Sequence, residues 1–353
     1  MTNAYKIAVI PGDGIGNEVM PEALKVLDAI AAKHDLAFTY DNKDWSCERF
    51  HKLGAMMPKD GLAKIRNHDA ILLGAVGFPG VPDHVSLWGL LIPIRREFRQ
   101  YVNLRPVRLF EGMPCPLAGR KPGDIDMLIV RENNEGEYSA IGGRQFEGTA
   151  HEMVVQQSIF TKFGTERIMR YAFEQAKLRP KKHVTSATKS NGISHSMPYW
   201  DERFEAVAAE YPGIKTDKFH IDILTAHFVR NPHWFDVVVG SNLFGDILSD
   251  LGPAVTGTIG IAPGGNINPE RDFPSMFEPV HGSAPDIAGK GICNPIGEIW
   301  SAAMMLDHLG HADAAADIVT AIERVIRDSD VKTPDMGGSA STSELGDAIV
   351  AAL

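Results

Sequence analysis

Short apolar runs alternate with longer segments of helical periodicity along this chain, and this alternation constrains the fold more than any other feature. Residues 7–10 are apolar, a glycine-rich loop follows at residues 11–16, and residues 19–32 carry apolar side chains at helical spacing. This order predicts a strand, a tight loop and a helix. Strands that alternate with helices are typical of an α/β architecture with a largely parallel sheet. Further strand-like runs follow at residues 38–40, 70–73, 126–130, 183–187 and 236–239.

The length and charge of the chain narrow the classes of function. At roughly 150 residues per domain, the 353 residues indicate two domains, with one very large domain as the alternative. Hydrophobic residues at 44% and charged residues at 23% are typical of a globular protein, which excludes disordered and fibrous classes. The formal net charge of −10 argues against a general affinity for nucleic acid or for an anionic membrane. An anionic ligand must therefore be bound by a local basic cluster.

The cysteines and the apolar runs predict a cytoplasmic location. The three cysteines, Cys47, Cys115 and Cys293, are far apart and form no C-x-x-C motif, so neither a disulfide framework nor a zinc site is indicated. A reducing compartment fits this pattern. The first residues lack the features of a secretory signal, and no apolar stretch approaches the ~18 residues that a membrane span requires. We expect no membrane partner.

Two glycine-rich regions interrupt the periodic pattern. Residues 132–152 are rich in Gly, Glu and Ser with little periodicity, and we interpret them as an extended arm or hairpin. Irregular segments of this length usually serve function or contact another subunit. A second cluster of Gly and Pro lies at residues 256–271, and the chain is helical in pattern from Asn294 onward. We expect domain changes near residues 100 and 255, with both termini in one domain.

The first glycine loop contains Gly12, Gly14 and Gly16, a G-x-G-x-G spacing. A Rossmann turn requires G-x-G-x-x-G, so the loop does not match that motif. It could contact a phosphate or an adenine ribose at the start of the following helix. A plain strand-to-helix turn that needs small residues is an equally good interpretation.

An arginine cluster is the strongest candidate for a binding site. Arginine forks bind carboxylates in a bidentate manner, so a di- or tricarboxylate ligand is indicated. The alternative is a solvated helix face, which fits Arg96 and Arg99. Arg105 instead has an apolar, strand-like context in which an unpaired guanidinium would be costly. Arg131 closes the apolar run at residues 127–130 and is a further candidate. The cluster comprises Arg95, Arg96, Arg99, Arg105 and Arg108.

Two aspartates indicate a metal site. Asp246 and Asp250 are four residues apart, which places both carboxylates on one face of a helix, where they repel unless a cation lies between them. Hard oxygen ligands suit Mg²⁺ or Mn²⁺. The alternative is acidic charge that stabilises the helix N-terminus. Asp222 lies among apolar residues and could supply a third carboxylate, and a buried acid there would need a partner.

Other residues could act in proton transfer or bind a nucleotide. Lys189 follows a strand end and could act as a base beside a metal, with Tyr138 as the complementary acid. Either residue alone is more typical of a surface or packing position. Residues 281–286 form a loop of mainly small residues suited to close approach by a nucleotide. Asp286 could bind a ribose diol and would repel a 2′-phosphate, which favours NAD over NADP.

Taken together, these segments resemble the β-decarboxylating dehydrogenases of 2-hydroxy acids, the isopropylmalate and isocitrate dehydrogenase family. The resemblance covers nearly all of the chain, and six matching blocks in the same order exclude chance agreement. Segments 86–89, 95–98 and 196–202 look most like the branch that acts on tartrate and D-malate. The blocks are IPGDGIG at residues 10–16, NLRP at 103–106, VRENNEGEY at 130–138, ATKSN at 187–191, SNLFGDILSD at 241–250 and EPVHGSAPDIAGKGICNP at 278–295.

The resemblance implies an α/β fold with two domains around a large mixed sheet, distinct from a Rossmann fold. Residues 1–100 and 255–353 would form a cofactor-binding domain, and residues 101–254 a substrate and dimerisation domain with an arm at about 132–152. A homodimer with shared active sites would use NAD and Mn²⁺ or Mg²⁺, and a place for K⁺ stays open. The implied site residues are Arg95, Arg105, Arg131, Trp88 and Leu91 for substrate, Tyr138 and Lys189 for catalysis, Asp222, Asp246 and Asp250 for metal, and His281, Gly282, Ser283, Ala284, Asp286, Asn294 and Asn191 for cofactor.

Departures from the family pattern bear on the substrate. Trp88 stands where isopropylmalate enzymes usually carry a glutamate, while Leu91 and Ile92 keep the apolar character of the region that meets the variable group of the substrate. A bulky indole would shrink the pocket, which favours D-malate, oxidised to pyruvate, CO₂ and NADH, and also tartrate. Gly264 and Gly265 differ from the commoner small-residue run, which the sequence does not explain. The alternatives are 3-isopropylmalate dehydrogenase and a catalytically silent nucleotide-binding regulatory subunit.

Overall fold

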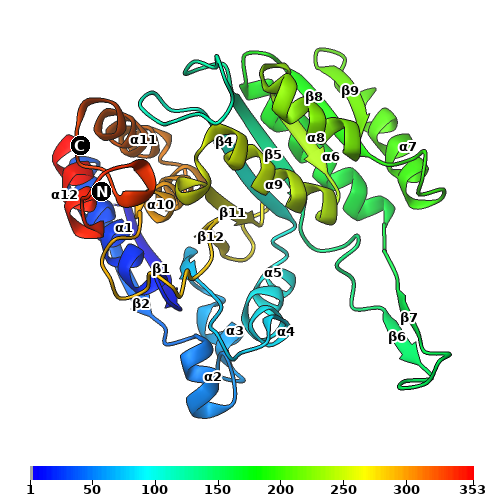
Figure 1. Ribbon diagram of the computed structural model, residues 1–353, viewed down its shortest axis with the longest axis horizontal. Coiled ribbons are helices and arrows are strands. Elements are labelled where there is room, and N and C mark those ends of the chain that lie inside the picture. The colour runs from blue at the N-terminus through cyan, green and yellow to red at the C-terminus, as the bar shows by residue number, and fades with distance from the viewer. Residues whose placement is uncertain (1–2) are drawn as a thin grey trace.

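The computed structural model describes residues 3–353 and contains one ten-stranded sheet that runs through the whole molecule (Figure 1). The strand order is β2-β1-β3-β12-β11-β4-β5-β10-β8-β9. A separate pair, β6 (Gly142–Gln145) and β7 (Met153–Gln156), forms a hairpin. The sheet strands are β1 (Asn3–Gly12), β2 (Leu36–Asn42), β3 (Ala70–Ala75), β4 (Val102–Arg108), β5 (Asp126–Glu132), β8 (His183–Thr188), β9 (Lys215–His220), β10 (Val237–Gly240), β11 (Pro263–Ile267) and β12 (Ser275–Pro279).

Helices connect the strands along the chain and pack against the sheet. A π-helical turn, Leu87–Leu91, joins α4 to α5. No helix among residues 3–353 is long and apolar enough to cross a membrane. The helices are α1 (Gly16–Lys33), α2 (Cys47–Leu53), α3 (Gly61–Ile65), α4 (Asp83–Ser86), α5 (Ile92–Glu97), α6 (Lys162–Leu178), α7 (Ser196–Ala208), α8 (Ile221–Arg230), α9 (Asn242–Thr256), α10 (Ile296–His308), α11 (Ala312–Asp328) and α12 (Thr342–Ala352).

The sheet is mixed, which confirms the α/β fold that the family resemblance implies and differs from the parallel sheet of a Rossmann domain. Its outer strands pair in parallel, whereas β12–β11, β11–β4 and β4–β5 pair antiparallel. The chain crosses from one half of the sheet to the other at β4 and returns at β11, so both crossings lie side by side in the centre. The residues at which the two domains divide stay a prediction.

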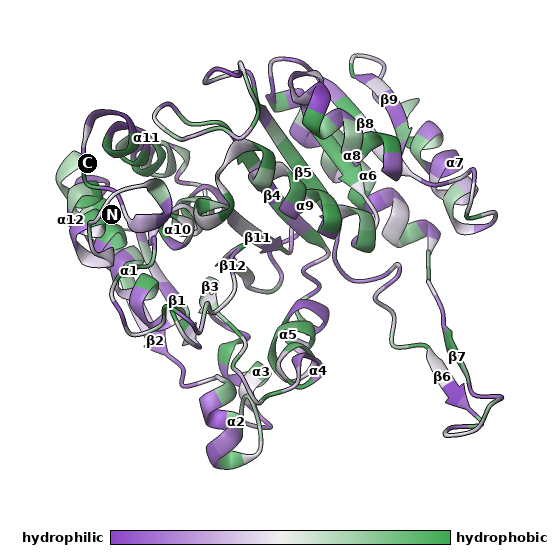
Figure 2. Ribbon diagram, in the orientation of Figure 1, coloured by the Kyte–Doolittle hydropathy of each residue, from purple (hydrophilic) through white to green (hydrophobic). Residues whose placement is uncertain are grey.

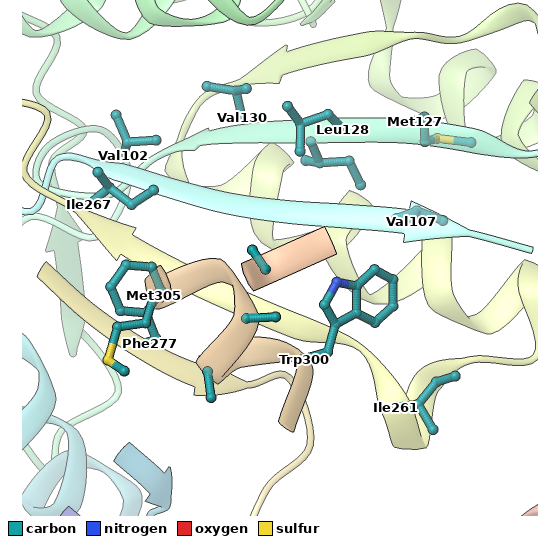
Figure 3. Packing of buried hydrophobic residues seen from close by; sticks show 14 of the residues in the cluster. Val102, Val107, Met127, Leu128, Val130, Ile261, Ile267, Phe277, Trp300 and Met305 are labelled. Carbon is teal, nitrogen blue, oxygen red and sulfur yellow. The ribbon is translucent and has the colours of Figure 1, made fainter. Parts of the chain in front are cut away.

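The core extends along both faces of this central region. On one face, α9 packs against β4 and β5, and a Cβ on Gly252 of α9 would lie 2.6 Å from Val107. On the other face, α6 packs against β5, and residues of β4, β5, α6 and α10 line a cavity. Figure 3 shows buried side chains of β4, β5 and β11 in the same part of the core as Trp300 and Met305 of α10. Side chains alternate between the faces of a strand, so the odd-numbered residues of β4 and β5 point toward α9.

Most elements expected from the periodicity are present, with one difference at the arm. The strand, glycine loop and helix predicted at the start are β1, the loop at residues 13–15 and α1. The arm does contain a hairpin, which projects away from the sheet (Figure 1), but its second strand ends at Gln156, beyond the expected limit at residue 152. The apolar residues Met153, Val154 and Val155 extend the pairing. Figure 2 shows that apolar residues are present even in this projecting segment.

Candidate active site

Two buried arginines project from neighbouring central strands. Arg105 of β4 and Arg131 at the end of β5 are only 7% and 5% exposed. The antiparallel register places Arg131 opposite Asn103, two residues from Arg105, so both arginines face α9. Burial lowers the pKa of Arg105 to about 10 and lowers that of Arg131, yet both remain charged at neutral pH.

Arg95 brings a third guanidinium to the same place from the last turn of α5. Its Nη2 donates a hydrogen bond to Glu278 Oε1 at 2.7 Å. Desolvation is the main cause of the lowered pKa of Arg105, and the attraction of Glu278 opposes it. Repulsion from Arg131 and Arg95 lowers the pKa further, because the three cations lie close together. The structure therefore brings together the three arginines that the sequence singled out. An anion with two carboxylates suits this arrangement.

The two aspartates of α9 lie beside these arginines. Asp246 pairs with Arg131, and a Cβ on Gly245 would come within 2.5 Å of the Arg131 Cβ, so the glycine lets α9 approach β5. Burial raises the pKa of Asp250, and repulsion from Asp246 raises it further. A cation between the two carboxylates would relieve this repulsion, so the donors fit a divalent metal.

Tyr138 contacts the same carboxylate. Its hydroxyl donates a hydrogen bond to Asp246 Oδ2 at 2.5 Å, and its ring lies 5.5 Å from the Arg131 guanidinium. Burial and this hydrogen bond raise the pKa of Tyr138 to about 12. The hydroxyl therefore keeps its proton at neutral pH, as a general acid requires.

Lys189 and Asp222 pair with each other and not with the α9 aspartates. Lys189 follows the end of β8, and its Nζ lies 2.5 Å from Asp222 Oδ1 in the first turn of α8. The expectation of a buried acid at this position is wrong, since the Asp222 side chain is 65% exposed. The residues described here contain no group of three or more His, Cys, Asp or Glu that could hold a metal. Asp222 therefore does not form one group with Asp246 and Asp250 in this chain.

The candidate cofactor loop packs against the first glycine loop. Ile15 N donates to Ser283 O at 2.9 Å, and a Cβ on Gly14, whose φ is +54°, would lie 2.1 Å from that oxygen. A Cβ on Gly12 or Gly16 would likewise meet backbone oxygen atoms, at 1.9 and 2.2 Å. Close packing thus accounts for all three glycines, which supports a turn of small residues over a phosphate-binding loop.

Two polar residues of the candidate cofactor region differ in whether their side chains already have hydrogen-bond partners. Burial lowers the pKa of His281, and its Nε2 has no partner within residues 3–353. Asn294 accepts a hydrogen bond from Ile296 N at 3.0 Å and donates one to Asp335 at 3.0 Å, so it holds the start of α10. His281 Nε2 is thus available to a ligand, whereas both polar atoms of the Asn294 side chain already form hydrogen bonds within the protein.

Trp88 lies on the π-helical turn and is 44% exposed. The guanidinium of Arg96 lies 4.8 Å from its ring, and Arg96 Nη2 donates to Tyr138 O at 3.1 Å. Arg96 is exposed, as expected for a solvated helix face, and it also links Trp88 to the segment that carries Tyr138. Leu91 is buried, on the same turn.

Sequence reasoning missed the residues that hold the arginines in place. Asn242 Oδ1 accepts hydrogen bonds from Arg131 Nε and Nη2 at 3.0 and 2.8 Å, and Glu278 accepts one from Arg95. Both residues lie in blocks that were recognised, SNLFGD and EPVHG. A search for acceptors to match each buried arginine could have selected them.

Comparison with known proteins agrees with this geometry. Residues 6–349 match the family model described as isocitrate/isopropylmalate dehydrogenase. The chain is 62% identical to D-malate dehydrogenase [decarboxylating] of Escherichia coli (strain K12), over 99% of this chain and 98% of that protein. It is 61% identical to tartrate dehydrogenase/decarboxylase of Pseudomonas putida, over 98% and 97%. The crystal structure of isocitrate dehydrogenase from Methylococcus capsulatus superposes with a TM-score of 0.88 at 35% identity, covering 99% of each chain.

Proposed function

Because this chain belongs to the isocitrate/isopropylmalate dehydrogenase family, we propose that it is an NAD- and metal-dependent enzyme that oxidises and decarboxylates a small 2-hydroxy dicarboxylic acid. The substrate would be D-malate, converted to pyruvate, CO₂ and NADH, with tartrate as a further substrate. The convergence of three arginines beside Asp246, Asp250 and Tyr138 carries the proposal. The names of the relatives at 62% and 61% identity favour this substrate class over isopropylmalate.

The three arginines would bind the two carboxylates of the substrate. Arg105 and Arg131 are buried and charged, so they have lost most of their hydration. A bound anion would compensate for this loss. Arg95 is fixed by Glu278 at the edge of the same group. Trp88 and Leu91 would border C3 of the substrate, and a large indole there leaves little room for an alkyl substituent.

Asp246 and Asp250 would hold Mn²⁺ or Mg²⁺ together with Asp222 of the partner subunit. When bound, the metal polarises the C2 oxygen and stabilises the negative charge that develops as CO₂ leaves. Lys189, next to Asp222 at 2.5 Å, would accept the proton of the C2 hydroxyl in the partner's site as hydride passes from C2 to NAD. Tyr138 would donate the proton that C3 gains when the carboxylate is lost.

A homodimer would complete each site. Within residues 3–353, the Lys189–Asp222 pair forms no salt bridge with an arginine, and Asp222 does not form one metal-binding group with Asp246 and Asp250. Ile223 and Val229 of α8 and Ile247 of α9 are 43%, 43% and 44% exposed, and a second copy of the chain would cover them. The projecting arm, with exposed Val154, would pack against the partner.

NAD would bind at the loop that follows β12. Asp286 would bind the adenosine ribose and repel the 2′-phosphate of NADP. A requirement for K⁺ and a cytoplasmic location also remain predictions, the latter supported by three free cysteines. The other residues proposed for the cofactor are Asn191, His281, Gly282, Ser283, Ala284 and Asn294.

The decisive experiment follows NADH at 340 nm with Mn²⁺ and measures CO₂ release in parallel. The panel contains D-malate, L-malate, the tartrates, 3-isopropylmalate and isocitrate. We expect preference for D-malate or tartrate. Preference for 3-isopropylmalate would overturn the substrate, and no turnover with any acid would favour a catalytically silent subunit.

A further inference from the structure

A chain of buried polar side chains connects Arg95 to Arg105. Glu278 Oε1 accepts hydrogen bonds from Arg95 Nη2 and from Asn266 Nδ2, both at 2.7 Å. Asn266 Oδ1 accepts from Asn103 Nδ2 at 2.9 Å, and Asn103 Oδ1 accepts from Arg105 Nε at 2.8 Å. We propose that this Glu278–Asn266–Asn103 relay is a positioning device that holds Arg95 and Arg105 at one spacing and so selects the length of the dicarboxylate. The inference rests on the proposed function of the two arginines.

The sheet itself builds the relay. Glu278, Asn266 and Asn103 lie on β12, β11 and β4, which are neighbours in the sheet, and the register pairs Asn266 directly with Asn103. Both asparagines are fully buried. A buried amide that loses its partner costs free energy, so the relay resists rearrangement. Arg95 belongs to α5 and Arg105 to β4, and the relay couples these separate elements.

The orientation of the Asn266 amide is determined by its neighbours. Its Oδ1 accepts from Asn103 and also from Asn133 Nδ2, each at 2.9 Å, while its Nδ2 faces the Glu278 carboxylate. A reversed amide would place oxygen against carboxylate and nitrogen against two donors. Each hydrogen bond of the relay therefore has a fixed donor and acceptor, from the Glu278 carboxylate that holds Arg95 to the Asn103 amide oxygen that holds Arg105.

Gly264 supports Arg105 from the adjacent strand. A Cβ at Gly264 would lie 2.9 Å from both Cζ and Nε of Arg105, so the guanidinium lies against the bare backbone of β11. At Gly265 the Cβ would instead meet the Phe277 ring, at 3.1 Å, on the other face of the strand. The glycine pair that the sequence left unexplained thus has one member that contacts the relay.

An exchange of charge between two relay residues tests the proposal. Asn266→Asp places two carboxylates side by side, and Glu278→Gln removes the charge that holds Arg95. The double variant Asn266→Asp/Glu278→Gln restores the net charge, because one substitution adds a carboxylate and the other removes one. It also restores the hydrogen bond, because the amide at position 278 can donate to the carboxylate at position 266. We expect each single variant to raise KM by about ten-fold or more, and the double variant to recover to within about three-fold of wild type.

The control is Asn268→Asp, which introduces the same change at another fully buried asparagine. The side chain of Asn268 accepts from Asp272 N and donates to Arg99 O, outside the relay. It should change the melting temperature without changing KM. Losses in KM that simply add in the double variant, or a lowered melting temperature with unchanged KM in Asn266→Asp, would overturn the relay.

A binding readout separates this inference from the proposed reaction. Succinate has two carboxylates but no hydroxyl, so its binding, followed as a rise in melting temperature, does not depend on turnover. If wild type oxidises none of the acids, the reaction fails while the succinate comparison still tests the relay. Should Asn266→Asp not fold, Gly264→Ala should raise the dissociation constant for succinate and Gly265→Ala should not. Equal effects of the two glycine variants would count against the proposal.

Discussion

The Tyr138 hydroxyl donates its hydrogen bond to Asp246, a carboxylate that is also a proposed metal ligand, at 2.5 Å. The other oxygen of that carboxylate pairs with Arg131. The proposed proton donor and the proposed metal ligand are thus joined directly by this hydrogen bond.

Replacing Tyr138 tests its role as the proton donor. Tyr138→Phe removes the hydroxyl and keeps the ring on Arg131, and we expect kcat to fall by about 10²- to 10⁴-fold because general acid catalysis is lost. The substrate affinity should change little. The measurement is steady-state formation of pyruvate, with a single-turnover assay of NADH to show that hydride transfer survives. Wild-type kcat would rule out this assignment.

Metal removal tests the α9 carboxylates. Excess EDTA should abolish turnover, and Mn²⁺ should restore it. Asp250→Asn removes one ligand and should raise the Mn²⁺ concentration for half-maximal activity by about ten-fold or more. Asp313→Asn, in the first turn of α11, is the matched control. Full activity in excess EDTA would dismiss Asp222, Asp246 and Asp250 as ligands.

Exchange of Trp88 tests the substrate pocket. Trp88→Glu replaces the indole with the residue usual in isopropylmalate enzymes, and the carboxylate can still pair with Arg96. We expect the ratio of kcat/KM for 3-isopropylmalate over D-malate to rise by about ten-fold, because a smaller side chain admits the alkyl group. No gain, with the fold intact by circular dichroism, would refute the role of Trp88.

Glu298 of α10 predicts a pH dependence of stability. It is fully buried, neither carboxylate oxygen has a hydrogen-bond partner in the described chain, and burial, with repulsion from Glu278, raises its pKa well above the ordinary 4.5. Because the folded pKa is the higher one, the contribution of Glu298 to stability is fully present below pH 4.5 and is lost as pH rises toward the folded pKa.

Glu298→Gln should therefore stabilise the protein relative to wild type, by an amount that grows between pH 5 and pH 8. Thermal melting across this range measures the difference. Glu202→Gln, at a side chain that is 65% exposed, should show no such trend. A constant difference between Glu298→Gln and wild type would show that Glu298 does not bind a proton on folding.

A charge on the arm tests the dimer. Val154 of β7 is 62% exposed in one chain, and Val154→Asp should produce monomers, because an unpaired carboxylate at an apolar contact costs several kcal/mol. Sedimentation and activity should fall together, since each site would lack Lys189 and Asp222 of the partner subunit. Thr149→Asp, in the turn of the same hairpin, is the control. An active, monomeric wild type would exclude shared sites.

Much of the fold and of the candidate site could be predicted from the sequence. The alternation of residues 7–10 and 19–32 already indicates β1 and α1, and the arginine cluster already identifies Arg95 and Arg105. The antiparallel centre was not predicted from these patterns, because a buried strand such as β5 is apolar in either orientation. The role of Glu278 was not predicted either, because its partner Arg95 is far away in the chain.

The sequence by itself determined which chemical groups are present and in which local setting: arginines suited to carboxylates, an i, i+4 pair of aspartates and a tyrosine that could act as an acid. Only the tertiary structure decided which of them meet. The order and register of β4, β11 and β12 bring Asn103, Asn266 and Glu278 together on one face of the sheet, and a shift of one residue in any of these strands would turn its side chain to the opposite face. Contacts between distant residues depend on that pairing, which local patterns do not encode.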